Sequence, residues 1–320
     1  MKNVKIKAFL MAIVRMPFGK LAAQTPADAV MMKPGEVCFD VSYGYSTWNE
    51  YWEGDSLRDN GNIGTMTTTT YAGGFMLGIM DRVNILAMLP YIKNAPSAGV
   101  VADVQDFQDI SVFVKALLLE KQLGKGNFKT LASVGYAAPI ADYVPDAAFP
   151  IGLACPDAIF RGVTQYDADM GLYARLDAAY HLRGTAVLER SYYYTTQSYY
   201  GDEVDMPNAL DYNATVGYIT KNKKFQAEAA FNGLTTFNGF DIRRQDGVFP
   251  SNDFESMRVG LNFDYYDLLT KGLAVHLNTG YVLAGSNIGK ATMITGGVSY
   301  QFQLWNSNNS TSTVVTPKID

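Results

Sequence analysis

The sequence predicts an all-β fold, a transmembrane antiparallel up-and-down β-barrel of about twelve strands. Three observations predict it. Segments of about ten residues, the length of a tilted spanning strand, alternate between apolar and polar residues. The connections between them alternate between short and long. No run of about 18 apolar residues offers a transmembrane helix, whereas a spanning strand needs only every second residue to be apolar.

The alternation is clearest in residues 165–181, QYDADMGLYARLDAAYH. Every second residue belongs to an unbroken apolar set: Tyr166, Ala168, Met170, Leu172, Ala174, Leu176, Ala178 and Tyr180. The residues between them are mostly polar, and they include Asp167, Arg175 and Asp177. Because side chains alternate across a strand, this pattern predicts one extended strand with two unlike faces.

The same pattern recurs on both sides of this segment. We expect spanning strands, in chain order, at 37–48, 67–80, 83–92, 109–118, 128–140, 165–181, 185–196, 210–219, 225–233, 256–266, 273–284 and 292–304. A sheet can cross hydrocarbon only when it closes without edges, because hydrocarbon offers no hydrogen bonds to unpaired backbone groups. The strands therefore predict one cooperative domain.

The connections predict which ends of the strands lie together. Links after even-numbered strands are short: MDR, KQLGKGN, HLRG, TKNKK and DLLTKG. Links after odd-numbered strands are long, except the last: 49–64, 93–106, 141–164, 197–208 and 236–253. Tight turns on one side and long loops on the other are typical of outer-membrane barrels. An even strand count places both termini on the short-turn side.

Alternation alone does not say which face meets water, since soluble barrels and sandwiches alternate too. Two features favour an apolar exterior. Tyrosines such as Tyr43, Tyr218 and Tyr281 stand near the ends of apolar rows, where hydrocarbon gives way to headgroups. The polar rows carry charges of both signs, as a hydrated lumen requires. We therefore expect the apolar rows to face lipid and the polar rows to line an enclosed lumen.

The chain ends predict export. Residues 1–25 have a basic start, a short apolar core and small residues suited to cleavage near Ala23, so we expect a signal peptide. The barrel domain is expected over 35–305, followed by a polar tail over 306–320. Together these features predict the outer membrane of a Gram-negative-type envelope. Cys38 and Cys155 have no metal-ligand spacing, and we expect two unpaired thiols.

Three stretches carry a family resemblance: YAGGFMLGIMDRVNILAMLPYI, FQDISVFVKALLLEK and FKTLASVGYAAPIADYVP. They contain a strand with Gly78, an Asp-Arg turn, a Leu89-Pro90 pair and a strand led by Asp109. In these features the chain resembles the meta-pathway phenol-degradation barrels, a group similar to outer-membrane transporters for hydrophobic compounds. The glycine-rich approach to the aspartate in that family is replaced here by VQDFQDI. The resemblance is clearest over 70–145 and implies a barrel that admits hydrophobic or aromatic molecules.

Charged residues of the polar rows are the candidates for a solute path. They are Asp169, Arg175, Asp177, Glu228, Arg258, Asp264 and His276. One interpretation is a charged constriction that orients a passing solute. The other is a set of cross-strand ion pairs that rigidifies a narrow barrel, because charges in such a space need partners. Lys115 is open to the same two interpretations.

The function expected from the sequence is passive uptake of small molecules, hydrophobic or aromatic ones among them. The alternatives are a closed structural barrel and, less favoured, an outer-membrane enzyme. His276 has no serine two residues away, and His181 is expected at a short turn. The partners expected are membrane lipid and a small solute; a net charge of −5 gives no basic footprint for nucleic acid. Oligomeric state stays open.

No cofactor and no metal ion are expected. The acidic loop EYWEGDSLRDNGN does not have the spacing of an EF-hand. The stretch 145–160 is apolar for an external loop, and two interpretations of it stay open: it folds into the lumen as a plug or entry port, or it packs on its neighbours.

Overall fold

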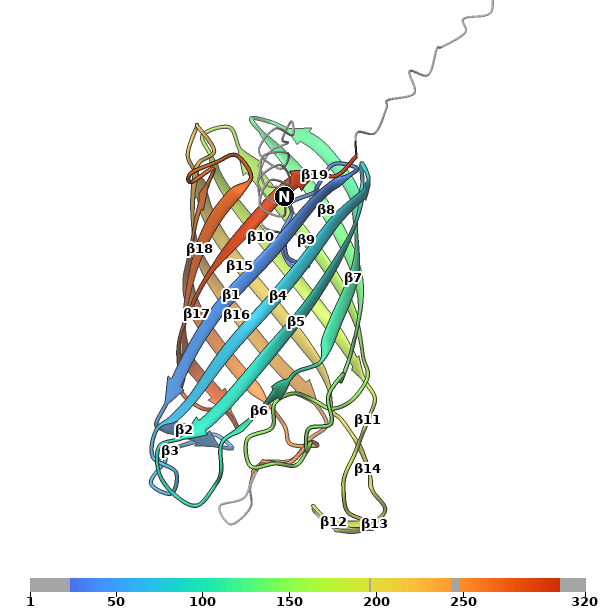
Figure 1. Ribbon diagram of the computed structural model, residues 1–320, viewed down its shortest axis with the longest axis vertical. Helices are drawn as coiled ribbons and strands as arrows, with labels where there is room; N and C mark the ends of the chain where they lie inside the picture. The colour runs from blue at the N-terminus through green and yellow to red at the C-terminus, as the bar shows by residue number, and fades with distance from the viewer. Residues whose placement is uncertain (1–23, 196, 243–247, 306–320) are drawn as a thin grey trace, which may run out of the picture.

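The structure, a computed structural model, describes residues 24–195, 197–242 and 248–305. Twelve long strands form a closed antiparallel barrel, as predicted (Figure 1). They are β1 (Glu36–Trp48), β4 (Met66–Met80), β5 (Val83–Pro96), β7 (Ile110–Leu123), β8 (Gly126–Ala138), β9 (Asp157–Ala168), β10 (Leu172–Arg183), β15 (Asn208–Ile219), β16 (Phe225–Phe237), β17 (Glu255–Tyr266), β18 (Leu273–Ser286) and β19 (Thr292–Gln303).

The barrel closes where its first strand meets its last. Val41 of β1 lies opposite Val298 of β19 on one side and Gly73 of β4 on the other. Each of the other long strands pairs with the long strand before it and the long strand after it in the chain. Closure leaves no free sheet edge, and this satisfies the backbone groups that hydrocarbon cannot satisfy.

The two ends of the barrel differ as the connection lengths predict. Short turns and the start of β1 lie at one end, at the top of Figure 1, which we call the short-turn end. The other, the long-loop end, carries short strands: β2 (Glu50–Glu53), β3 (Ser56–Asp59), β6 (Val104–Phe107), β11 (Thr185–Val187), β12 (Tyr192–Tyr194), β13 (Ser198–Tyr200) and β14 (Glu203–Asp205). Loop 287–291 is the short exception there.

Two element predictions are wrong. Residues 165–181 are not one strand but a hairpin, with β9 ending at Ala168 and β10 beginning at Leu172. Gly171 adopts a φ of 92° in the turn between them. Residues 185–196 do not span the barrel; they contain β11 and β12 in the long loop after β10. The first error missed one spanning strand and the second added one that does not exist. The predicted number of spanning strands, twelve, is therefore still correct.

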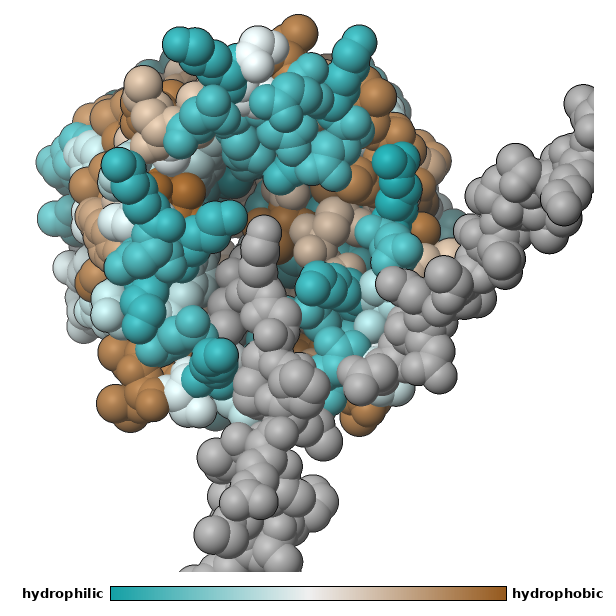
Figure 2. All heavy atoms as spheres, turned by 90° about the horizontal axis from the view of Figure 1, so that it is seen from above, coloured by the Kyte–Doolittle hydropathy of each residue, from teal (hydrophilic) through white to brown (hydrophobic). Residues whose placement is uncertain are grey.

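The outer surface is apolar, as predicted. Val41, Leu176 and Val216 point outward and are 68%, 62% and 61% exposed. Figure 2, a view onto the short-turn end, shows apolar side chains along the outer edge and polar ones around the mouth. Leaving this belt in water would be unfavourable, whereas hydrocarbon accommodates it. No helix in the described part of the chain is long and apolar enough to span a membrane.

The interior has two unlike walls, whereas the sequence predicts a polar lining throughout. Inward side chains of β4, β5, β7, β8 and β9 form a buried apolar wall: Met76, Leu86, Phe113, Leu117, Leu131, Ile159 and Val163. The opposite wall, from β10 and β15 to β18, carries polar and charged side chains. The apolar wall needs a cover, because water inside the barrel would otherwise contact it.

Candidate functional site in the barrel lumen

That cover is the segment that precedes β1, residues 24–34, which we call the N-terminal strap. It turns back into the barrel at Gly35, whose φ is 80° and whose N–H donates to the carbonyl of Gly78 at 2.8 Å. Ala29 is 4% exposed and belongs to the cluster of Leu117 and Leu131. Met32 is 2% exposed and belongs to the cluster of the apolar wall. The strap thus completes a small hydrophobic core inside the barrel.

A buried cation anchors the strap. Lys115 on β7 is 0% exposed, and its ammonium donates to Asp28 Oδ1 at 2.6 Å and to the Thr25 carbonyl at 2.8 Å. The side-chain amides of Gln24 and Asn84 hydrogen-bond to each other beside it. A buried charge is costly unless it is paired and hydrogen-bonded, so the Lys115 ammonium requires the strap in this position.

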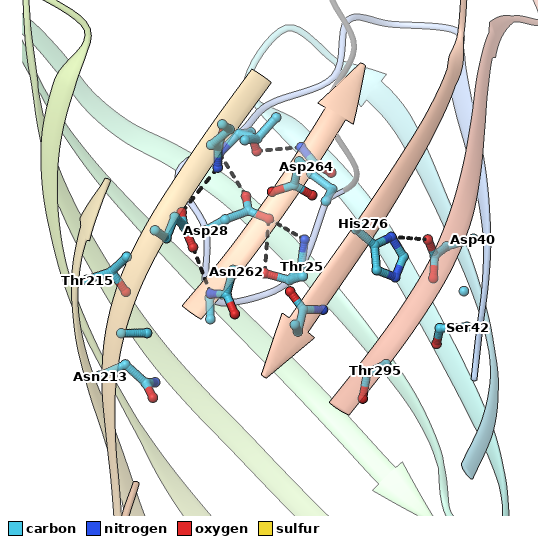
Figure 3. Close-up of a pocket in the computed structure, with 18 of the residues that line it drawn as sticks. Thr25, Asp28, Asp40, Ser42, Asn213, Thr215, Asn262, Asp264, His276 and Thr295 are labelled. Carbon is cyan, nitrogen blue, oxygen red and sulfur yellow. Dashed lines mark hydrogen bonds and ion pairs between the residues drawn. The ribbon is translucent and has the colours of Figure 1, made fainter. Parts of the chain in front are cut away.

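A cavity of about 530 Å³ lies between the strap and the polar wall (Figure 3). The strap contributes Thr25 and Asp28, and β4 and β5 contribute apolar residues that include Met76 and Met88. Asparagine, glutamine and threonine side chains from β15 to β19 make up much of the rest: Asn213, Thr215, Gln226, Asn232, Asn262, Asn278 and Thr295. The cavity is therefore amphiphilic, with a polar wall facing a short apolar strip.

Six of the seven candidate residues line this cavity: Arg175, Asp177, Glu228, Arg258, Asp264 and His276. Asp169 does not. It lies in the turn between β9 and β10, is exposed, and its N–H donates to the Lys125 carbonyl at 3.0 Å. The prediction placed it on the inward row because that row was read as one strand through the turn.

Several of these charges are held in ion pairs across strands. Arg175 on β10 lies 3.1 Å from Glu228 on β16, which also accepts a hydrogen bond from the Tyr173 hydroxyl at 2.5 Å. Arg161 on β9 pairs with Asp177 and, at 2.6 Å, with Asp211. These contacts correspond to one of the two interpretations of the charged rows, the set of cross-strand ion pairs.

His181 lies in the same network and not at a short turn, so its predicted position is wrong. It points inward from the part of β10 nearest the long-loop end, with Nδ1 2.7 Å from Asp157 and Nε2 3.0 Å from Asp211. The error follows from the misplaced hairpin, because HLRG at 181–184 leads into the long loop rather than a tight turn.

Three charged cavity residues lack such strong partners. The Asp264 carboxylate makes no hydrogen bond or ion pair with the residues that the structure describes. Arg258 has no carboxylate within ion-pair distance in that part of the chain; its guanidinium lies 3.8 Å from the Met293 sulfur. Asp40 lies 3.5 Å from His276 Nδ1, outside ordinary hydrogen-bond range. These groups are the ones available to a solute.

The apolar stretch 145–160 does not fill the lumen. Tyr143 donates a hydrogen bond to Asp109 and accepts one from the Ala154 N–H at 2.8 Å, while Asn94 donates to the Phe149 and Pro150 carbonyls. Burial raises the pKa of the Asp109 carboxyl in this loop region. Loop 139–156 thus packs on its neighbours at the long-loop end, and the lumen is filled from the opposite end by the strap.

The remaining site predictions concern thiols and metals. Cys38 and Cys155 are both buried and free, as predicted. Burial raises the pKa of the Cys155 thiol to about 11. Within the described ranges, no group of three or more His, Cys, Asp or Glu side chains could hold a metal ion. The predictions for residues 1–23 of the signal peptide and for the tail 306–320 concern residues outside the described ranges.

Comparison with known proteins supports the fold. No family model matches the sequence, and no curated protein matches it closely enough to count as a relative. The COG4313 outer membrane channel from Pseudomonas putida F1 is structurally similar, with a TM-score of 0.70 and 14% sequence identity, covering 88% of this chain and 100% of that chain. The chain therefore has the fold of an outer-membrane channel barrel.

Two further solved structures are less similar. The translocator domain of autotransporter NalP from Neisseria meningitidis has a TM-score of 0.44 at 13% identity, covering 95% of this chain and 94% of that one. The TodX deltaS2S3 mutant monoaromatic hydrocarbon channel has a TM-score of 0.40 at 10% identity, with 85% and 91% covered. Both scores are too low to carry an argument.

Proposed function

We propose that this chain is an outer-membrane channel that admits small solutes by passive diffusion. The observation that supports it best is the amphiphilic cavity of about 530 Å³ inside a closed barrel with an apolar exterior. A barrel that served only as a structural element would fill its interior with side chains, as narrow barrels do. Here the cavity stays open, and the side chains of Asp264 and Arg258 line it without an ion-pair partner among the described residues. The proposal assigns no catalytic residue.

In this proposal the short-turn end faces the periplasm and the long loops face outward, the usual orientation of such barrels. The solute enters between the long loops, reaches the cavity and meets the strap, which occupies the periplasmic side of the lumen. Passage therefore requires the strap to shift. Its contacts with the barrel are a small apolar cluster, one buried ion pair and a few hydrogen bonds, so movement of the strap does not require the barrel to unfold.

The amphiphilic lining favours small molecules that have both an apolar part and a polar group. Met76 and Met88 offer a polarizable apolar surface that adapts to different shapes. The asparagine and threonine side chains opposite offer hydrogen bonds. A small aromatic molecule with one polar substituent fits both walls, and this agrees with the solute class that the family resemblance implies.

Reconstitution into liposomes tests the proposal. Single-channel conductance and uptake of phenol are measured for the full chain and for a variant that lacks residues 24–33. We expect the full chain to take up phenol with low ionic conductance, and the shortened chain to conduct more. If neither protein conducts or takes up phenol, the barrel is not a transporter and the alternative of a closed structural barrel replaces it.

A further inference from the structure

The charges that line the cavity are not balanced. Five carboxylates line it, those of Asp28, Asp40, Asp177, Glu228 and Asp264, against the guanidinium groups of Arg175 and Arg258. Three of the carboxylates already have cations, since Asp28 pairs with Lys115, Asp177 with Arg161 and Glu228 with Arg175. Of the two that remain, Asp264 has no charged partner in the described ranges, and Asp40 has only His276, whose Nδ1 lies 3.5 Å away.

The two remaining carboxylates lie on one side of the cavity. Asp264 on β17 is the register partner of His276 on β18, and Asp40 on β1 lies on the other side of that histidine (Figure 3). Two further carboxylates, those of Glu228 and Asp28, line the same cavity, each already paired with a cation. Asp40 Oδ2 is shielded from water and has no hydrogen-bond partner in the described part of the chain. A bound cation would relieve this concentration of negative charge.

An apolar strip begins directly beside these carboxylates. Asp40 is the register partner of Gly74 on β4, and Gly74 is the register partner of Met88 on β5. A Cβ at Gly74 would lie 3.3 Å from both the Asp40 Cβ and the Met76 methyl group, so the glycine eases the close approach of these two side chains. Met88 is 37% exposed to the lumen, and its apolar surface is open to a ligand.

A hydrogen-bonding group on the opposite wall also lacks a partner. Thr215 on β15 lines the cavity and is 5% exposed, yet its hydroxyl makes no hydrogen bond with the residues that the structure describes. Because Thr215 lines the cavity, its hydroxyl is available to donate a hydrogen bond to a ligand or accept one from it. The cavity thus presents unpaired negative charge, an adjacent apolar surface and a free hydroxyl.

From this arrangement we infer that the cavity is a binding site for small organic cations, amines whose ammonium group lies beside Asp40 and whose apolar body lies on Met76 and Met88. Asp264, on the far side of His276, adds to the negative potential at this site. The inference rests on the proposed function and adds a charge preference to it. Arg258 does not change this preference, because it lies six residues along β17 from Asp264, roughly 20 Å away at the rise of a strand.

Binding by the purified full chain in detergent tests the inference with three matched probes. 2-Phenylethylamine, 2-phenylethanol and phenylacetate share an aromatic ring and differ in the charge of the polar group. Isothermal titration calorimetry at low ionic strength gives the Kd of each. We expect the amine to bind at least about tenfold more tightly than phenylacetate, with the alcohol between them.

Substitutions then locate the effect. Asp264→Asn and, separately, Asp40→Asn are expected to reduce the preference for the amine by about fivefold or more. Asp169→Asn is the matched control, because it removes the same charge from an exposed turn outside the cavity and is expected to change nothing. Far-UV circular dichroism checks that each variant folds, and the second aspartate provides the test if the first variant does not.

Three results would overturn the inference: equal affinity for amine and phenylacetate, an unchanged preference in both cavity variants, or an equal loss in Asp169→Asn. The binding assay does not depend on transport, so the two proposals fail separately. A clear preference for the amine without flux into liposomes would support the binding site and contradict the channel. Flux without any preference for the amine would support the channel and contradict the binding site.

Discussion

Lys115→Met tests the role of the strap most sharply. The lysine ammonium is 0% exposed and has two partners in the strap, Asp28 at 2.6 Å and the Thr25 carbonyl at 2.8 Å. Methionine has similar length and keeps the apolar contacts of the side chain, but it removes both hydrogen bonds. It also leaves the Asp28 carboxylate, 11% exposed, without its cation.

The expected magnitude follows from that burial. Removing one partner of a buried ion pair costs about 3–5 kcal/mol, because the other charge stays buried without compensation. The strap can avoid this cost by leaving the lumen, since Asp28 would then be hydrated. A change of about 3 kcal/mol raises the population of the released strap by more than about 100-fold.

Two measurements detect release of the strap. Hydrogen exchange of the peptide covering residues 24–35 is expected to speed up by about 100-fold or more, and the single-channel conductance is expected to rise. Lys129→Met is the matched control: Lys129 also points into the lumen and lies 2.9 Å from Asp167, but both side chains are partly exposed, 23% and 32%. Such pairs contribute about 0–1 kcal/mol, so little change is expected.

A double variant separates charge from packing. Replacing Asp28 by leucine in the Lys115→Met background removes both buried charges, which is often nearly neutral, and slow exchange of the strap is expected to return. If Lys115→Met leaves both exchange and conductance as they are in the unmodified chain, the ion pair does not anchor the strap and the reasoning is wrong.

Three other predictions concern the barrel itself. Leu176→Arg, which places a charge on the lipid face at mid-strand, is expected to lower the free energy of unfolding in lipid by about 2–4 kcal/mol, while Leu57→Arg in a loop hairpin is expected to have little effect; equal effects would contradict the lipid-facing assignment. Gly135→Ala brings a Cβ within 2.2 Å of an inward aromatic ring and is expected to cost about 1–3 kcal/mol in urea unfolding, whereas Gly162→Ala meets nothing within 4 Å and is expected to be neutral. Both thiols are buried, and the pKa of Cys155 is raised to about 11. Iodoacetamide at neutral pH is therefore expected to modify neither thiol in the folded barrel and both after unfolding, as measured by intact mass. Rapid labelling of Cys155 in the folded chain would show that loop 139–156 is open.

The fold could be predicted from sequence because a spanning barrel imposes a strict period of two on every strand. The same property explains the misread hairpin. The turn between β9 and β10 has three residues, so Ala168 and Leu172 lie four apart and keep the same parity. The alternation therefore passes through the turn without a change of phase. Only Asp169 and Gly171, both frequent turn residues, marked its position.

The strap could not be predicted, because residues 24–34 have neither the period of a strand nor a recognised motif. One indirect signal was present. Lys115 lies on the inward row of β7 between Phe113 and Leu117, so an apolar surface surrounds a charge that needs a partner. The partner, Asp28, is 87 residues away in sequence, and no local pattern connects the two. Arg161 was overlooked for a different reason: the predicted link 141–164 contains it, whereas the structure places it on β9. Asp211 lies on a predicted strand, but its partners Arg161 and His181 were both misplaced.

Spin-label accessibility along β15 tests most directly the claim on which the account rests, that the apolar face of each strand meets lipid and the other face lines an enclosed lumen. Single cysteines at 213, 214, 215 and 216 are labelled in a background without the native thiols and reconstituted in bilayers. We predict that labels at Ala214 and Val216 collide with oxygen dissolved in the lipid and are shielded from a water-soluble nickel reagent, and that labels at Asn213 and Thr215 are shielded from oxygen. Strong collision with oxygen at Asn213 and Thr215 but not at their neighbours, or no alternation along the strand, would contradict it.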